Sequence, residues 1–107
     1  MSYDFSMYLK TERSKVYTRL SYNYTYNVSP IFSKALKGES IATIHGMRGD
    51  EALQMLADGV NDMYANMDEY RRMNPKNGWG DSNGALHILE ALVRYAKEFP
   101  DGIFEVN

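Results

Sequence analysis

Apolar and polar residues alternate along the first part of the chain. From Tyr3 to Lys10 the apolar side chains fall at every second position, and the alternation resumes from Lys15 to Tyr24 after the polar residues 11–14. A period of two is typical of a half-buried β-strand, and a short polar connection between two such runs predicts a hairpin. We therefore expect an antiparallel hairpin at the N-terminus.

The middle and end of the chain change to the helical period. Residues 49–67 and residues 82–99 each repeat apolar residues at three- and four-residue steps, which predicts two amphipathic helices. Asp50 is expected to cap the first helix and Asp81 or Ser82 the second. The apolar positions of the first helix are Leu53, Leu56, Val60, Met63 and Met67, widened by Ala52, Ala57 and Tyr64.

Shorter helical segments are expected between the hairpin and the first long helix. Ser29 followed by Pro30 resembles an N-cap with proline at the first helical position, which predicts a helix over residues 30–36. Residues 39–45 could form one or two further turns, and residues 103–106 read as a closing strand. This order predicts one α+β domain, residues 1–107. Its small antiparallel sheet combines the N-terminal hairpin with the C-terminal strand and packs against two main helices and short helical turns.

Composition and charge narrow the possible functions. The chain has no cysteine, which excludes disulfides, thiolate metal sites and cysteine nucleophiles. Residues 1–38 carry six basic and two acidic residues, whereas residues 39–107 carry six basic and twelve acidic ones. The acidic part argues against direct nucleic-acid binding and favours a basic protein partner. No apolar run has the ~20 residues of a membrane span, and no signal peptide is recognisable, so we expect a cytoplasmic protein.

Two segments combine aromatic and amide side chains in a way that suggests ligand binding. Residues 22–27 interleave tyrosine with asparagine, and residues 74–84 form a glycine-rich turn around the single tryptophan. Such residues offer flat stacking faces and directional hydrogen bonds. If the two segments converge, they form one polar-aromatic pocket; otherwise the tyrosines cap a sheet edge and the tryptophan packs beneath a turn. The candidate ligand-binding residues are Tyr24, Tyr26, Asn27, Lys76, Asn77 and Trp79.

A second candidate surface is acidic. Four carboxylates recur along the first long helix and its continuation: Glu51, Asp58, Asp62 and Glu69. Such a run is usually a solvated helix face, and its alternative role is a docking surface for a basic partner.

Signals for catalysis or metal binding are weak. Residues 80–84 match the G-x-S-x-G nucleophile elbow, but no apolar strand precedes them, and His87 follows Ser82 in the same helix. A helix cap explains this motif better, and a small hydrolase using Ser82 or Asp81 is the weakest reading. His45 and His87 have no second ligand at helical spacing apart from Glu90, three residues after His87, and one such pair is more often a surface contact, so we expect no metal and no cofactor. An anion at this helix start, near Lys76, is opposed by Asp81.

Several segments together resemble a known group of proteins. Residues 1–4, residues 23–30 (NYTYNVSP) and residues 73–81 (MNPKNGWGD) with Gly84 are similar to small proteins of about this length from bacteriophages and mobile or bacterial genomes. The resemblance implies a phage-associated accessory protein in the host cytoplasm and transfers no catalytic residue. We therefore predict a non-enzymatic binding protein that inhibits or modulates a host or defence macromolecule. The alternative is a protein that sequesters a small, nucleotide-like ligand.

Overall fold

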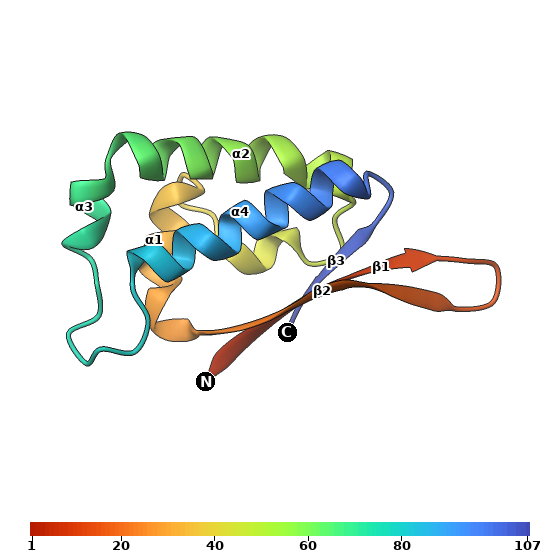
Figure 1. The fold of residues 1–107 in the computed structure, drawn as a ribbon, viewed down its shortest axis with the longest axis horizontal. Helices are drawn as coiled ribbons and strands as arrows, with labels where there is room; N and C mark the ends of the chain where they lie inside the picture. The colour runs from red at the N-terminus through yellow and green to blue at the C-terminus, as the bar shows by residue number, and fades with distance from the viewer.

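The structure is a computed structural model that describes residues 1–107, and it confirms the predicted α+β fold (Figure 1). The strands are β1 (Ser2–Lys10), β2 (Lys15–Thr25) and β3 (Ile103–Val106). The helices are α1 (Ser29–Ala35), α2 (Gly49–Ala65), α3 (Met67–Arg71) and α4 (Ser82–Glu98). Two 3-10 turns, η1 (Tyr26–Val28) and η2 (Ile41–Ile44), flank α1. None of these helices has the length and apolar character needed to cross a membrane.

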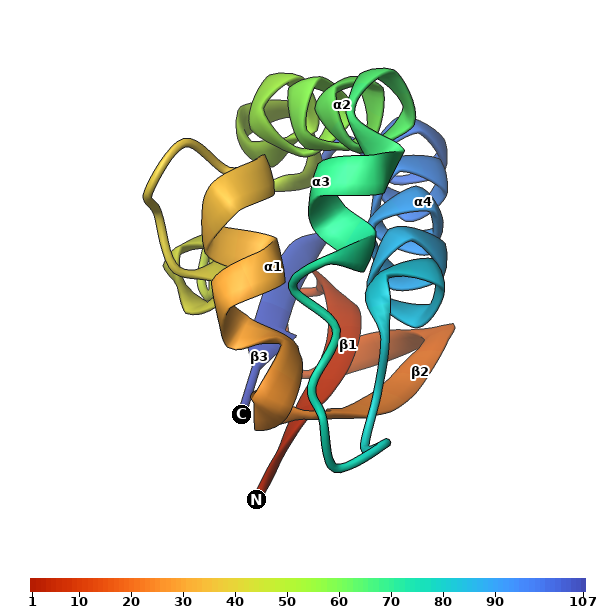
Figure 2. The same cartoon turned by 90° about the vertical axis from the view of Figure 1, so that its left-hand side faces the viewer.

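The sheet is antiparallel, with strand order β2-β1-β3. Phe5 at its centre pairs with Tyr22 on one side and with Val106 on the other. The far edge of β3 is covered, because the backbone N–H of Phe104 donates to the carbonyl oxygen of Met47 at 2.9 Å. The far edge of β2 has no such neighbour, and Figure 2 shows this strand at one border of the sheet.

The helices cover one face of the sheet and enclose a single core (Figures 1 and 2). Phe5 and Met7 point from β1 into this core, as the period-two pattern predicts, and both are buried. The buried stripe of α4 is also as expected, with Leu89 at its centre. The stripe of α2 is shifted towards Ala52, Leu56, Gly59 and Met63, so the predicted placement of Tyr64 is wrong: this side chain is 60% exposed.

Two predicted helix caps are wrong. Ser29 already lies inside α1, because η1 runs directly into it, and its hydroxyl donates to the carbonyl oxygen of Tyr26 at 2.6 Å. The cap of this helical segment is Thr25, whose side chain accepts from the N–H of Asn27. In α2 the cap position is Arg48 rather than Asp50, which falls in the first turn. The helix predicted over residues 49–67 ends earlier, at Ala65. The helical conformation is interrupted at Asn66 and resumes in the separate helix α3.

Candidate functional site

The exit from β2 and the loop before α4 meet in space. The hydroxyl of Tyr24 accepts a hydrogen bond from the backbone N–H of Asp81 at 3.0 Å, although the two residues are far apart in sequence. A side chain at Gly80 would place its Cβ 2.6 Å from Thr25 Cγ2, and the ring of Tyr24 occupies the space where a Cβ of Gly84 would stand. Both glycines are therefore needed for this close approach.

The same region begins the last long helix as predicted. The carboxylate of Asp81 accepts from the N–H of Gly84 at 2.7 Å, which is the expected N-cap bond of α4. Asn74 adds a second tie, because its side-chain oxygen accepts from the N–H of Ser82 at 2.8 Å. The loop from residue 74 to residue 81 is thus anchored at its end by side-chain hydrogen bonds.

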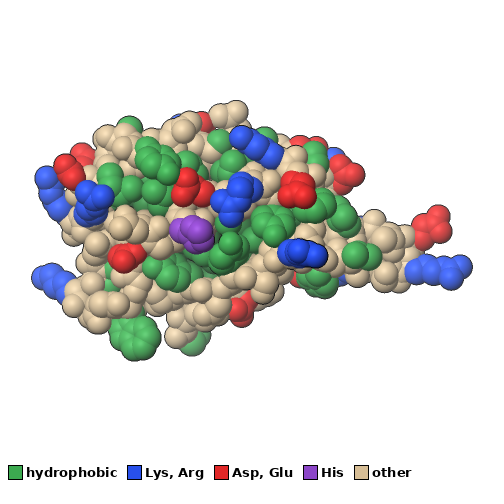
Figure 3. Space-filling view, viewed as in Figure 1, with side chains coloured by type: hydrophobic (Ala, Val, Ile, Leu, Met, Phe, Trp, Pro, Cys, Tyr) green, Lys and Arg blue, Asp and Glu red, His purple; other side chains and the backbone are tan.

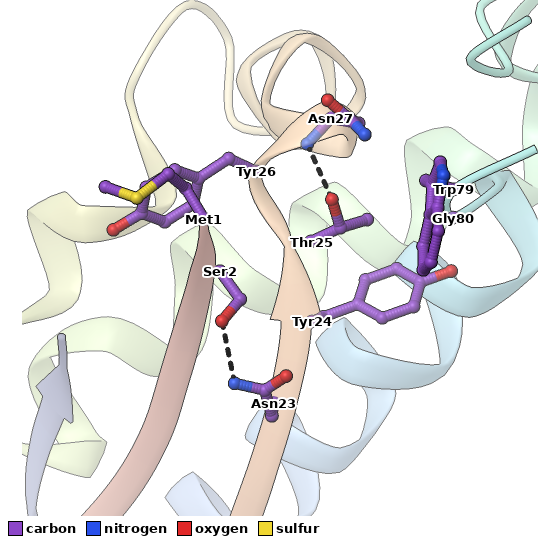
Figure 4. A pocket seen from close by; sticks show the side chains of 9 residues that line it. All are labelled: Met1, Ser2, Asn23, Tyr24, Thr25, Tyr26, Asn27, Trp79 and Gly80. Carbon is purple, nitrogen blue, oxygen red and sulfur yellow. Dashed lines mark hydrogen bonds between the residues drawn. The ribbon is translucent and has the colours of Figure 1, made fainter. Parts of the chain in front are cut away.

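A hollow of about 680 Å³ lies between these two segments (Figure 4). It is open to solvent, and no charged side chain lines it. Its lining residues are Met1, Ser2, Asn23, Tyr24, Thr25, Tyr26, Asn27, Trp79 and Gly80. Figure 4 places Trp79 and Gly80 across β2 from Met1 and Ser2. The hollow therefore presents hydroxyl, amide and aromatic groups.

Trp79 is held in position but is not buried. It stands between two glycines with positive φ, +77° at Gly78 and +85° at Gly80, and its own N–H donates to the side chain of Asn77 at 3.0 Å. The indole is nevertheless 69% exposed, so it is not packed beneath the turn. No hydrogen bond of the structure uses the indole N–H, the hydroxyl of Tyr26 or the side-chain amide of Asn27. These three groups are available to a partner.

Four of the six predicted ligand-binding residues line the hollow, namely Tyr24, Tyr26, Asn27 and Trp79. Asn77 lies outside the lining, where it supports the turn, and Lys76 is exposed beside it without an ion pair. The sequence reasoning missed Met1 and Ser2 as lining residues. The hairpin register could have indicated Ser2, because this residue pairs with Thr25.

The four acidic candidates do not form one continuous face. The carboxylate of Glu51 accepts from the backbone N–H of Arg48 at 2.9 Å, and that of Asp58 accepts from the side chain of Gln54 at 2.8 Å. These two border a second hollow of about 470 Å³ on α2. Asp62 follows one turn after Asp58 on α2, whereas Glu69 belongs to α3, which begins after a break in the helix.

Asp62 and Glu69 make their contacts around Tyr70. The hydroxyl of this fully buried tyrosine donates to the carboxylate of Asp62, and burial, reinforced by that hydrogen bond, raises the pKa of Tyr70. Glu69 forms an ion pair with Lys34 of α1 at 3.3 Å. Both carboxylates thus hold α3 against its neighbours.

Ser82, His45 and His87, which carried the weak catalytic and metal-binding signals of the sequence, make structural contacts in the folded chain. Ser82 is buried, with 1% of its surface exposed, in the first turn of α4. His87 packs edge-on against the ring of Tyr22, and His45 accepts the backbone N–H of Val106 at 3.0 Å. No three histidine, aspartate or glutamate side chains are arranged to hold a metal ion.

Comparison of the chain with protein-family models, with curated proteins and with solved structures found no match. The resemblance to small phage-associated proteins therefore stays a prediction. The geometry of the hollow carries the functional argument.

Proposed function

We propose that this protein is a non-enzymatic binding protein whose working surface is the hollow beside Trp79. The observation that carries the proposal is the 69% exposure of a tryptophan that two glycines and Asn77 hold in place. Tryptophan is among the residues that dominate binding energy at protein interfaces, and exposed apolar surface commonly marks an interaction site.

The fixed loop favours binding as well. A side chain that is already ordered loses little conformational entropy when a partner covers it. Asn27, whose side-chain amide is unused, lines the same hollow and would fix the partner's orientation. An aromatic anchor with a few directional polar groups is the usual composition of a recognition surface.

A macromolecular partner fits this surface better than a nucleotide. The hollow is open, and none of its lining side chains carries the positive charge that would pair with a phosphate. Lys76 lies outside the lining. The resemblance to phage accessory proteins supports a host or defence macromolecule in the cytoplasm as the partner, which this protein would inhibit or modulate by occupying it.

Affinity capture with matched variants tests this proposal. Wild-type protein, Trp79→Ala and Tyr64→Ala are immobilised, and proteins retained from host lysate are identified by mass spectrometry. Tyr64 is a suitable control because it is 60% exposed on α2, outside the hollow. We expect a partner that the wild type and Tyr64→Ala retain and Trp79→Ala loses. Equal retention by all three proteins would contradict the proposal.

Tryptophan fluorescence tests the small-ligand alternative. The chain has one tryptophan, so its emission reports on the hollow alone. We expect no change when nucleotides are added, because no lining side chain offers a positive charge to their phosphates. A saturable change in emission that is lost on Tyr26→Ala would instead support a nucleotide-like ligand.

A further inference from the structure

The free edge of β2 exposes a defined set of backbone groups. The N–H of Asp4 donates to Asn107 and the N–H of Asn107 donates to Asp4, so the backbone groups of Asp4 point away from β2. The N–H of Tyr26 donates to Met1, which places Tyr26 on the side that faces β1. Hydrogen-bonded and non-hydrogen-bonded pairs alternate along an antiparallel ladder.

The same alternation holds for the residue pairs of β1 and β2. Tyr22 and Tyr24 pair with β1 through their backbone groups, whereas Ser21 and Asn23 direct their N–H and C=O groups outwards. Thr25 directs its N–H outwards, and its C=O belongs to the first turn of η1. β2 has no second neighbour in the sheet, and none of the hydrogen bonds outside the strands and helices involves these outward backbone groups. The stretch from Ser21 to Thr25 is therefore an unpaired strand edge.

Only the first half of this edge is protected against another strand. Lys15 and Arg19 place charges there, and the pairing is interrupted by a bulge in which Met7 faces Thr18–Leu20. Charges and bulges are the usual means by which proteins block edge pairing. The stretch from Ser21 to Thr25 has no charged residue, no proline and no bulge.

The unprotected stretch leads directly to Trp79. In Figure 4 the indole stands on the side of β2 that is opposite β1, next to Tyr24 and Thr25. Half-buried tyrosines follow the same strand, and Figure 3 shows hydrophobic side chains in a band between the helical layer and the hairpin on this face. Backbone pairing groups, aromatic surface and the exposed indole are thus contiguous.

We propose that an extended, uncharged polypeptide segment of the partner adds to the sheet along Ser21–Thr25 and places an apolar side chain against Trp79. This inference rests on the proposed binding function and names the partner's chemistry. Unpaired N–H and C=O groups in strand geometry are matched by another strand. The side chains that line the hollow are all uncharged, so their electrostatic complement is a segment without charged side chains, which loses no ionic hydration on binding.

Substitution at Asn23 separates backbone pairing from side-chain contacts. Asn23→Pro and Asn23→Ala both remove the amide that bonds Ser2 and Asp4, and only the proline variant also removes the outward N–H. Proline is tolerated at an edge position whose N–H is free, so both variants are expected to fold. Circular dichroism and the denaturation midpoint check this first.

The probe is a displayed library of random peptides of about nine residues, the upper range of natural strands. Peptides are selected on the wild-type protein, and their affinities are then measured against the variants. We expect uncharged, proline-free sequences that lose roughly tenfold or more in affinity, about 1.4 kcal/mol, on Asn23→Pro and on Trp79→Ala. Asn23→Ala should change affinity by less than about threefold.

Each other outcome is decisive. Binders that distinguish Trp79→Ala but not Asn23→Pro would overturn strand addition while leaving the proposed function standing. Peptides that bind Trp79→Ala as tightly as the wild type, or a selection that yields no binders, would overturn both strand addition and the proposed function. Charged selected sequences would refute the partner's stated chemistry. A wild-type dimer in light scattering that Asn23→Pro converts to a monomer would show that a second copy occupies the edge.

Amide exchange measured by NMR tests the register itself. In the free protein we expect slow exchange at Tyr22 and Tyr24 and fast exchange at Ser21 and Asn23. On addition of a selected peptide, the amides of Ser21 and Asn23 should become protected. Protection of these two amides in the free protein, or none with peptide, would overturn the proposal.

Discussion

Gly80 fixes the backbone beside Trp79 by both its conformation and its packing. Its backbone φ of +85° is in the region that residues with a Cβ rarely adopt, and the neighbouring side chains of Thr25 and Val28 leave no room for one. Gly78, on the other side of the tryptophan, has φ of +77° but open space around it. One glycine is thus required by backbone conformation alone and the other by packing as well.

Replacing each of the two glycines by alanine separates these requirements. We expect Gly78→Ala to lower the free energy of unfolding by ~1–2 kcal/mol, the cost of a left-handed conformation. Gly80→Ala should cost roughly 1–3 kcal/mol more, because its Cβ meets Val28 Cγ1 of the buried core at 2.9 Å. Chemical denaturation measures both. Equal losses would mean that the loop does not pack on the β2 exit as described.

On the outer face of the sheet, one carboxylate connects all three strands. Glu105 of β3 accepts from the hydroxyl of Tyr17 on β2 at 2.7 Å and from that of Ser6 on β1 at 3.4 Å, and it lies 3.6 Å from Lys15 Nζ. The hydrogen bond from Tyr17, followed by the charge of Lys15, lowers the pKa of Glu105. The ionised form is therefore the one that stabilises the fold.

The contribution of Glu105 should depend on pH in a known direction. Because its pKa is lower in the folded chain than in the unfolded chain, its stabilisation is present above the ordinary glutamate pKa of about 4.3 and is lost as the pH falls below it. We expect Glu105→Gln to cost roughly 0.5–1 kcal/mol at pH 7. Denaturation at a series of pH values should show this difference disappearing towards pH ~3, and a difference that grows with acid would refute the assignment.

Across the whole molecule, the close approach of α2 to α4 and the candidate binding surface lie at opposite ends of α4. Trp79 precedes its first turn, whereas Gly49 at the start of α2 lies against the backbone at its last turn. A Cβ at Gly49 would stand 2.5 Å from the carbonyl oxygen of Phe99. This contact lets the two long helices approach closely above the sheet.

Alanine at Gly49 should therefore destabilise the fold without altering the hollow. We expect Gly49→Ala to reduce the free energy of unfolding by ~1–3 kcal/mol, measured by denaturant titration, because two backbones must separate. Gly59→Ala is the matched control within α2: its Cβ would meet Leu36 Cδ2 at 3.2 Å, and the gain in helix propensity offsets part of the strain. Native Trp79 emission should be the same in both variants. A larger loss for Gly59→Ala would contradict this packing.

Local sequence patterns predicted the strands and long helices well, but they predicted the caps and ends of the helices less well. The hairpin and both long helices follow from hydrophobic periodicity, and the Asp81 cap follows from its residue type. The caps at Ser29 and Asp50 were wrong, because neighbouring turns and backbone geometry took these roles. The acidic run looked continuous only because the break at Asn66 has no local signal as strong as glycine or proline.

For the candidate site, the sequence indicated the two segments that meet but not every residue at their meeting point. Interleaved tyrosine and asparagine with a glycine-flanked tryptophan indicated polar-aromatic recognition chemistry. That Asn77 supports the turn while Ser2 lines the hollow depends on where separate segments come to lie.

Periodicity and capping chemistry are properties of neighbouring residues, so they can be read from the order of amino acids alone. The strand order, the free edge of β2 and the meeting of Tyr24 with the Trp79 loop depend on contacts between distant segments. Packing of the core selects these contacts, because a buried face of the sheet must find its helices and no single segment contains that information.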